Sequence, residues 1–250
     1  MAITLYKFGA NWGVSDPSPF CVKLESFLRL NNIEYTLGEF DIKTSIGKAP
    51  KKKIPYIVTE SGQQIGDSTL IIEHFSKEKH IDMDAGLSPE NRAISHGFRR
   101  MLDEAFYFIV LYSRWGDDRG WDVLMPQFFG EVPTSFLRKV ISDRIRAGVV
   151  KKAWDQGIGR HSIEEIYEMG RKDLEALSHL LAGDTWFFGS EQPTLLDIWC
   201  HAYIINLTRV PIENELKAHC LGFQNLCAHA ERFQELVYPE LSQQDEKQAA

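Results

Sequence analysis

The sequence has little cysteine. Its 250 residues include four cysteines, at positions 21, 200, 220 and 227, too few for the disulfide framework of a small secreted protein. No two of them have the Cys-x-x-Cys spacing of a structural zinc site. We therefore predict free thiols, no bound metal and a reducing compartment.

Targeting and membrane-spanning segments are also lacking. The residues from Met1 to Phe8 contain no basic region followed by a long apolar one, so we expect no signal peptide. No apolar run approaches the roughly 20 residues that a membrane-spanning helix needs. These absences predict a cytoplasmic protein with no membrane span.

Positive charge is in deficit as well. The chain has 28 Lys and Arg against 35 Asp and Glu, a net charge of -7, which argues against a nucleic-acid partner. The run Lys51-Lys52-Lys53 is a local exception that we interpret as a solvated loop. With 44% hydrophobic and 25% charged residues, the composition is that of a globular protein long enough for two modest domains.

The first 80 residues mix strand and helix patterns. Alternation of apolar and polar residues predicts a strand over 3–8, and a Gly/Asn/Ser/Asp/Pro loop follows over 9–17. Ser18 and Pro19 have the residue types of an N-cap and first helical position, which predicts a helix to Asn32. Further strands are predicted over 33–40, 54–59 and 63–65, and a helix from Asp67-Ser68. The strand over 33–40 should run parallel to the first, since a helix connects them.

After residue 80 the strand pattern disappears. A linker is predicted over 81–87, and a helix should begin at Ser88-Pro89 and reach about Arg114. Ser162 with Glu165 forms one predicted capping box, and Thr194 with Asp197 a similar one. The chain thus divides into an α/β domain at 1–80, of order βαβ-ββα, and an all-α domain at 88–250.

Three short signals in the first domain suggest a ligand site. Ser18 places a hydroxyl at a helix N-terminus, where free N–H groups and the helix dipole favour an anion such as an ionised thiol. Ile54-Pro55 opens a strand, and a cis peptide there would expose the backbone to a peptide ligand. At Asp67-Ser68, free N–H groups of residues 68 and 69 and the Ser68 hydroxyl could hold the carboxylate of an amino-acid head group, and Asp67 its ammonium. Each signal also has a plain structural interpretation, as a helix cap or a strand-initiating proline.

Taken together, the order and spacing of these signals resemble the glutathione S-transferase family. The resemblance implies a thioredoxin-like N-terminal domain, a helical C-terminal domain, glutathione as a substrate, no metal and a homodimer. It implies that Ser18 donates to the glutathione sulfur and that the Ile54 backbone, with cis Pro55, pairs with the cysteinyl peptide. Asp67 and Ser68 would hold the γ-glutamyl group and Lys53 the glycyl carboxylate.

Two further runs resemble one branch of this family. The segments Asp16–Phe20 and Gly157–Ser162 are similar to the failed-axon-connections proteins, a branch that is related to metaxins and is less clearly enzymatic. In the second half, aromatic residues gather between Phe106 and Phe129. We expect Tyr107, Tyr112 and Trp115, with Trp12 from the 9–17 loop, to line an apolar pocket. Arg160 and His161 could reach this site, but a surface position beside the helix cap at Ser162 is the simpler interpretation.

The leading functional hypothesis is detoxification by conjugation of glutathione thiolate to a small hydrophobic electrophile, such as an epoxide, halide or activated alkene. Lowering a thiol pKa by two units requires about 2.7 kcal/mol. One charge-assisted hydrogen bond, about 1.5–3 kcal/mol, and a helix N-terminus supply that amount. A non-catalytic binding module is the alternative. Thiol-disulfide chemistry at Cys21 is a third, although Cys21 lies inside the predicted helix, where we expect it to be buried.

Overall fold

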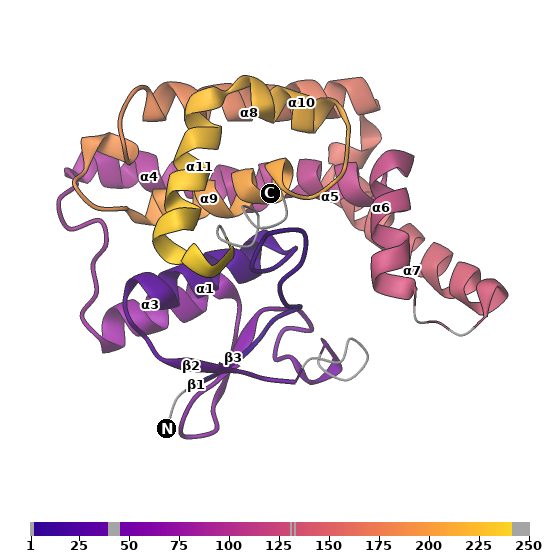
Figure 1. Ribbon diagram of the computed structural model, residues 1–250, viewed down its shortest axis with the longest axis horizontal. Helices are drawn as coiled ribbons and strands as arrows, with labels where there is room; N and C mark the ends of the chain where they lie inside the picture. The colour runs from indigo at the N-terminus through magenta and orange to yellow at the C-terminus, as the bar shows by residue number, and fades with distance from the viewer. Residues whose placement is uncertain (1–2, 40–45, 131, 133, 242–250) are drawn as a thin grey trace.

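A computed structural model describes residues 3–39, 46–130, 132 and 134–241. The chain forms a small sheet with its helices, followed by a mostly helical half (Figure 1), which confirms the predicted fold class. The elements of the first half are β1 (Ile3–Tyr6), α1 (Pro19–Leu30), β2 (Tyr35–Leu37), β3 (Tyr56–Val58), β4 (Gln64–Gly66) and α3 (Ser68–Glu78).

The four strands form one mixed sheet in the order β2-β1-β3-β4. β1 pairs with β2 in parallel, as predicted, and with β3 antiparallel, while β3 and β4 form an antiparallel hairpin. The first three strands are shorter than the predicted ranges, whereas β4 has the predicted length and lies one residue later. β2 lies at an edge and pairs only where β1 runs beside it, from Ile3↔Tyr35 to Leu5↔Leu37. The predicted strand end at Phe40 lies outside the described residues.

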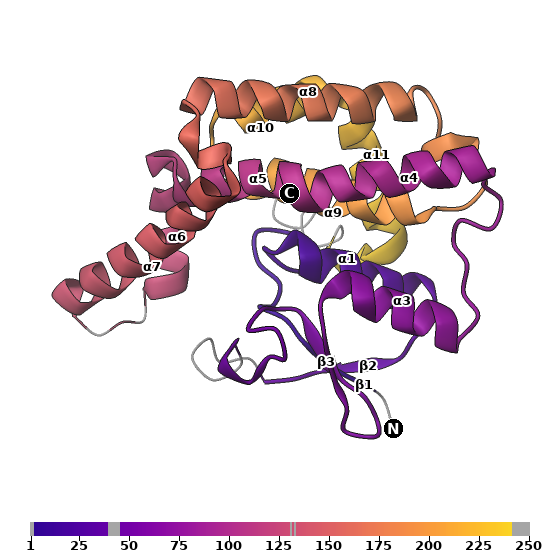
Figure 2. The same ribbon diagram turned by 180° about the vertical axis from the view of Figure 1, so that it is seen from behind.

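Helices α1 and α3 lie between the sheet and the helical half (Figures 1 and 2). α1 is apolar on the faces that meet both neighbours, and Leu24, Phe27 and Leu28 are fully buried. It ends at Asn31, whose side-chain amide donates to the Phe27 carbonyl oxygen. α3 begins at the N-cap Asp67 and buries Ile71, among others, against α1.

The second half contains the remaining helices. A nearly continuous rod starts at the N-cap Ser88, as predicted, and contains a π-helical turn at Leu102–Phe106. The capping box of Ser162 and Glu165 is present. Figure 1 and Figure 2 show α6 and α7 projecting from one side of the molecule. The bounds are α4 (Pro89–Met101), α5 (Tyr107–Trp115), α6 (Asp118–Phe129), α7 (Ser135–Gln156), α8 (Ile163–Leu181), α9 (Leu195–Thr208), α10 (Glu215–Gly222) and α11 (Gln224–Val237).

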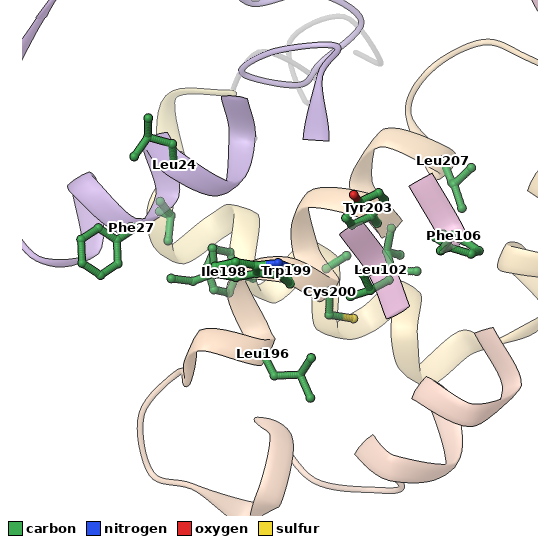
Figure 3. Close-up of a cluster of buried hydrophobic side chains, with 14 of the residues drawn as sticks. Leu24, Phe27, Leu102, Phe106, Leu196, Ile198, Trp199, Cys200, Tyr203 and Leu207 are labelled. Carbon is green, nitrogen blue, oxygen red and sulfur yellow. The ribbon is translucent and has the colours of Figure 1, made fainter. Parts of the chain in front are cut away.

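One hydrophobic core joins the two halves. It runs from the sheet through Leu24 and Phe27 of α1 to Ile198 and Trp199 of α9 (Figure 3). The segment over 81–87, predicted as a linker, packs on the helical half because the buried Asp84 accepts a hydrogen bond from the Leu195 N–H at 3.0 Å. The α9 side of this core therefore supports α1, at whose N-terminus the predicted sulfur site lies.

Candidate functional site

Ser18 lies at the N-cap position of α1, directly after the 9–17 loop. Its side chain is partly exposed and makes no capping hydrogen bond to the helix backbone. The predicted N-cap position of Ser18 is confirmed, but its hydroxyl does not cap the helix. Its N–H donates to a carboxylate oxygen of Asp16 at 2.8 Å, which fixes the backbone that carries the hydroxyl.

Asp16 organises the loop around this serine. Its carboxylate is fully buried and also accepts a hydrogen bond from the Gly9 N–H at 2.9 Å, so it joins the end of β1 to the start of α1. Burial raises the pKa of Asp16 to about 6, although the Gly9 and Ser18 N–H groups and the Lys7 ammonium oppose the rise. Asp16 thus acts on the loop from inside, and it does not face a ligand.

Cys21 lies in the first turn of α1 and is fully buried, as predicted. Its thiol contacts the Asp16 carboxylate and the Ser18 hydroxyl, and burial raises its pKa well above the ordinary value. A buried thiol that remains protonated is a poor nucleophile. Thiol-disulfide chemistry at Cys21 therefore finds no support in this geometry.

The helical half holds the same loop through Arg114 of α5 and Asn206 of α9. The Arg114 guanidinium is buried and donates to the Pro17 carbonyl oxygen and, at 3.1 and 3.0 Å, to the backbone and side-chain oxygens of Asn206. The Asn206 amide in turn donates to the Asp16 carbonyl oxygen at 3.3 Å. Burial lowers the pKa of Arg114 to about 10, so it stays charged at neutral pH.

These hydrogen bonds of Arg114 and Asn206 to the 9–17 loop, called the clamp below, were not predicted from the sequence. One signal for it exists, because Arg114 follows an apolar and aromatic run in its helix, and an Arg in such a run is rarely buried without partners. The identity of those partners depends on contacts between residues about a hundred positions apart.

The peptide bond between Ile54 and Pro55 is cis, as predicted. Ile54 is 9% exposed and lies just before β3. Lys53, the candidate for the glycyl carboxylate, is exposed beside it. Tyr6 of β1 stacks on Tyr56 of β3 with ring centroids 4.4 Å apart.

Asp67 and Ser68 open α3 as expected, but with different hydrogen bonding. The Asp67 carboxylate accepts hydrogen bonds from the N–H groups of Thr69 at 3.0 Å and Leu70 at 3.3 Å. The prediction that the Thr69 N–H is free for a ligand carboxylate is therefore wrong for this structure. Asp67 remains exposed, and Ser68 is 3% exposed beneath it.

The four predicted pocket residues do not form one cluster. Tyr107 of α5 packs edge-on against Phe20 of α1, with centroids 4.8 Å apart, and so lies close to the Ser18 turn. Trp115 packs on Phe128 of α6, which in turn meets Phe8 at the end of β1. These contacts bring α5 and α6 against the sulfur-site loop.

The other two pocket residues have different surroundings. The ring of Tyr112 lies over Gly116 of its own chain segment, where an added Cβ would come within 2.7 Å. Trp12 belongs to the loop and has a positive φ of 51°. A separate cavity of about 10 Å³ beside Arg114 and Asn206 has room for about one water molecule, too little for an organic substrate.

Within residues 3–39, 46–130, 132 and 134–241, no three His, Cys, Asp or Glu side chains gather where they could hold a metal ion. In the same part of the chain, no helix combines the length and apolarity needed to cross a bilayer.

The fold and the arrangement of α1, cis Pro55 and α3 define a member of the glutathione S-transferase family, and the chain belongs to it. Residues 19–120 match the model of the glutathione S-transferase N-terminal domain, and residues 170–233 match that of the C-terminal domain. The isoprene-epoxide glutathione S-transferase of Rhodococcus sp. is 32% identical over 190 residues, with 76% of this chain and 80% of that protein covered.

Other relatives include the failed axon connections protein of Drosophila melanogaster, 30% identical, and metaxin-1 of Sus scrofa, 25% identical. The matches cover 95% and 94% of this chain but 58% and 75% of the two relatives. These relatives confirm the resemblance to the metaxin-like branch.

Among solved structures, glutathione transferase F7 of Populus trichocarpa has a TM-score of 0.60 at 14% identity, and the match covers 97% of this chain and 98% of that chain. A glutathione S-transferase of Methylobacterium radiotolerans in complex with glutathione sulfonate has a TM-score of 0.58 at 15% identity, covering 97% and 94%.

Proposed function

We propose that this protein binds glutathione along α1, Pro55 and α3 and transfers its thiolate to a small hydrophobic electrophile, with an epoxide as the first candidate. The observation that carries the proposal is the geometry at Ser18. Its N–H is anchored by Asp16, the residue is partly exposed at a helix N-terminus, and its hydroxyl makes no capping bond. The name of the Rhodococcus relative supports an epoxide as the electrophile.

In this proposal each group has one task. The Ser18 hydroxyl donates a hydrogen bond to the glutathione sulfur and stabilises its ionised form, which the helix N-terminus also favours. The backbone before Pro55 pairs with the cysteinyl peptide, and Lys53 approaches the glycyl carboxylate. Asp67 and Ser68 hold the γ-glutamyl group. Tyr107 and Phe20 contribute an apolar wall near the sulfur for the electrophile, which would enter from the side of α5 and α6.

Binding and catalysis are tested separately. Glutathione at about 100 times its Kd should raise the unfolding free energy by about 2.7 kcal/mol, measured by thermal shift. Glutathione conjugation to a simple epoxide should then exceed the uncatalysed rate. A shift without conjugation would limit the protein to binding, and the absence of both would refute the proposal.

The role of Ser18 is tested by replacing it with Ala. Losing a hydrogen bond of about 1.5–3 kcal/mol to the thiolate should lower the conjugation rate at pH 7 by about 10–100-fold. The rate should recover as the pH rises, because the bound thiol then ionises without help. Ser18→Thr, which keeps a hydroxyl, is the matched control. An unchanged pH profile in Ser18→Ala would remove Ser18 from the mechanism.

A second candidate function is a binding module for an acidic protein partner, favoured by the surface of α7. This projecting helix contains six Lys and Arg residues and two Asp, although the chain as a whole is acidic. Large apolar side chains are exposed along it, with Phe136 79%, Val140 49% and Trp154 54% accessible, an unusual exposure for a surface without a partner. Absence of a glutathione-induced thermal shift would leave this candidate as the better one.

A further inference from the structure

Three of the four cysteines gather where α9, α10 and α11 meet. Cys220 belongs to the last turn of α10, Cys227 to the first turn of α11 and Cys200, labelled in Figure 3, to α9. The Cys227 Sγ donates to the Cys220 carbonyl oxygen at 3.5 Å. The pKa values of the two thiols are also shifted by each other. Cys220 and Cys227 are therefore neighbouring thiols.

The corner between the two helices fixes this contact. The Phe223 N–H donates to the Cys220 carbonyl oxygen at 3.0 Å, and the Cys227 N–H donates to the Phe223 carbonyl oxygen at 3.2 Å. These bonds fold the chain back on itself between the two cysteines. With the Cys227 Sγ held 3.5 Å from the Cys220 carbonyl oxygen, the two cysteines share one corner of the fold, and such closeness is a precondition for a disulfide.

The two thiols differ in access to solvent. Cys227 is partly exposed, whereas Cys220 and Cys200 are fully buried. The hydrogen bond from Cys220 lowers the pKa of Cys227 below that of an ordinary thiol, even though burial and the Glu231 carboxylate oppose this. A partly exposed thiol of lowered pKa next to a second thiol is the arrangement found in cysteines that react with oxidants.

We propose that Cys227 and Cys220 are a reactive dithiol that small disulfides, glutathione disulfide in particular, oxidise to an intramolecular disulfide. The Cys227 thiolate attacks one sulfur of glutathione disulfide. A bond forms between Cys227 and that sulfur, the original disulfide bond breaks, and one glutathione leaves as a thiolate that takes up a proton. Cys220 then loses its proton to solvent and attacks the Cys227 Sγ, which releases the second glutathione. The dithiol is oxidised by two electrons, and glutathione disulfide is reduced to two glutathione molecules.

This site is distinct from the one around Ser18. It lies in the helical half, it shares no residue with the proposed glutathione site, and its reaction requires no bound glutathione beforehand. A failure of the Ser18 proposal leaves it intact. Ser18→Ala should therefore react with glutathione disulfide as the unmodified protein does.

The products are measured by intact-mass spectrometry of the full chain after incubation with glutathione disulfide. The unmodified protein should lose two hydrogen atoms, and peptide mapping should assign the new disulfide to Cys220 and Cys227. Cys220→Ser should accumulate one glutathionyl group at Cys227, because the second thiol is missing. Cys227→Ser should form neither product, while Cys21→Ser and Cys200→Ser should behave like the unmodified protein.

The hydrogen bond between the thiols is tested by alkylation of Cys227 with iodoacetamide at pH 7. Cys220→Ala removes the donor and should slow alkylation by about three- to fivefold, the factor for a net hydrogen bond of about 1 kcal/mol. Cys220→Ser retains a hydroxyl donor and should restore most of the rate.

Two results would overturn the proposal. One is a folded, unmodified protein that gains neither a disulfide nor an adduct from glutathione disulfide, while its urea-unfolded form does react. The other is a product that maps to Cys21, or to a disulfide involving Cys200. Both are read on the unmodified chain, so the test does not depend on whether any variant folds.

Discussion

Replacing Asp16 with Asn probes the buried carboxylate that holds the Ser18 loop. The carboxyl has an ordinary pKa of 3.8, and burial raises it to about 6 in the folded protein. The folded state therefore binds this proton more tightly than the unfolded state does. Asn keeps the shape of the side chain and cannot ionise.

The sign of the effect follows from the two pKa values. Well below pH 4 the carboxyl is protonated in both the folded and the unfolded state, so its raised pKa does not reduce the unfolding free energy. Between about pH 4 and 6 the unfolded chain releases the proton while the folded chain retains it, so the contribution of Asp16 to stability falls as the pH rises. Above about pH 6 the loss is complete. It amounts to about 3 kcal/mol, at 1.36 kcal/mol for each pKa unit.

Urea unfolding of both proteins between pH 4 and 7.5 measures this difference. The unfolding free energy of the unmodified protein, minus that of Asp16→Asn, should decrease by about 2.5 kcal/mol across this range, since part of the change already lies below pH 4. Every other titrating group is common to both proteins and cancels. Asp173→Asn is a useful comparison because burial also raises the pKa of the partly exposed Asp173 to about 6. A difference that stays constant, or that grows with pH, would refute the assignment of a raised pKa to Asp16.

Other substitutions test other parts of the structure. Asp197→Ala should cost about 3–5 kcal/mol, because its buried carboxylate accepts hydrogen bonds from Thr194, Phe187 and His229; a Tm within a few degrees of the unmodified protein would contradict this. Gly120→Ala should destabilise the protein by about 1–3 kcal/mol, since the added Cβ would lie 2.0 Å from the Ser113 carbonyl oxygen. Gly97→Ala, where the added Cβ has nothing within 4 Å, should stabilise the protein by about 0.4–1 kcal/mol. Calorimetry compares the two variants, and equal effects would show that α5 and α6 do not pack this closely. Arg114→Lys should lose about 2 kcal/mol in urea unfolding, because one ammonium cannot replace a guanidinium on three buried oxygens; a change below about 0.5 kcal/mol would mean that the clamp contributes little.

Much of the fold follows from signals between near neighbours in the sequence. The helix starts at Ser88, Ser162 and Asp67 were predictable because a cap is a contact across two to four residues. The parallel pairing of β1 and β2 follows from the helix between them. The cis peptide before Pro55 was predicted from a proline at the start of a strand, together with the order of the signals around it.

Other features depend on contacts between distant residues, which these local signals do not specify. Strand length depends on where a partner strand lies, and β2 is limited to the three residues that pair with β1, from Ile3↔Tyr35 to Leu5↔Leu37. The Ser18 hydroxyl makes no capping bond, and its backbone is anchored by Asp16 instead. The sequence also did not predict which cysteines lie together, because the contact of Cys220 with Cys227 requires the chain to turn between two helices.

The sulfur-site loop illustrates both kinds of feature. Short sequence motifs were sufficient to predict the family resemblance, the loop and the serine that follows it. Only the folded chain brings Asn206 to the Asp16 carbonyl, across 190 positions, and Arg114 to the Pro17 carbonyl, across 97. Buried polar groups must find partners wherever packing places them, and packing is set by the whole core, which no short segment of sequence specifies.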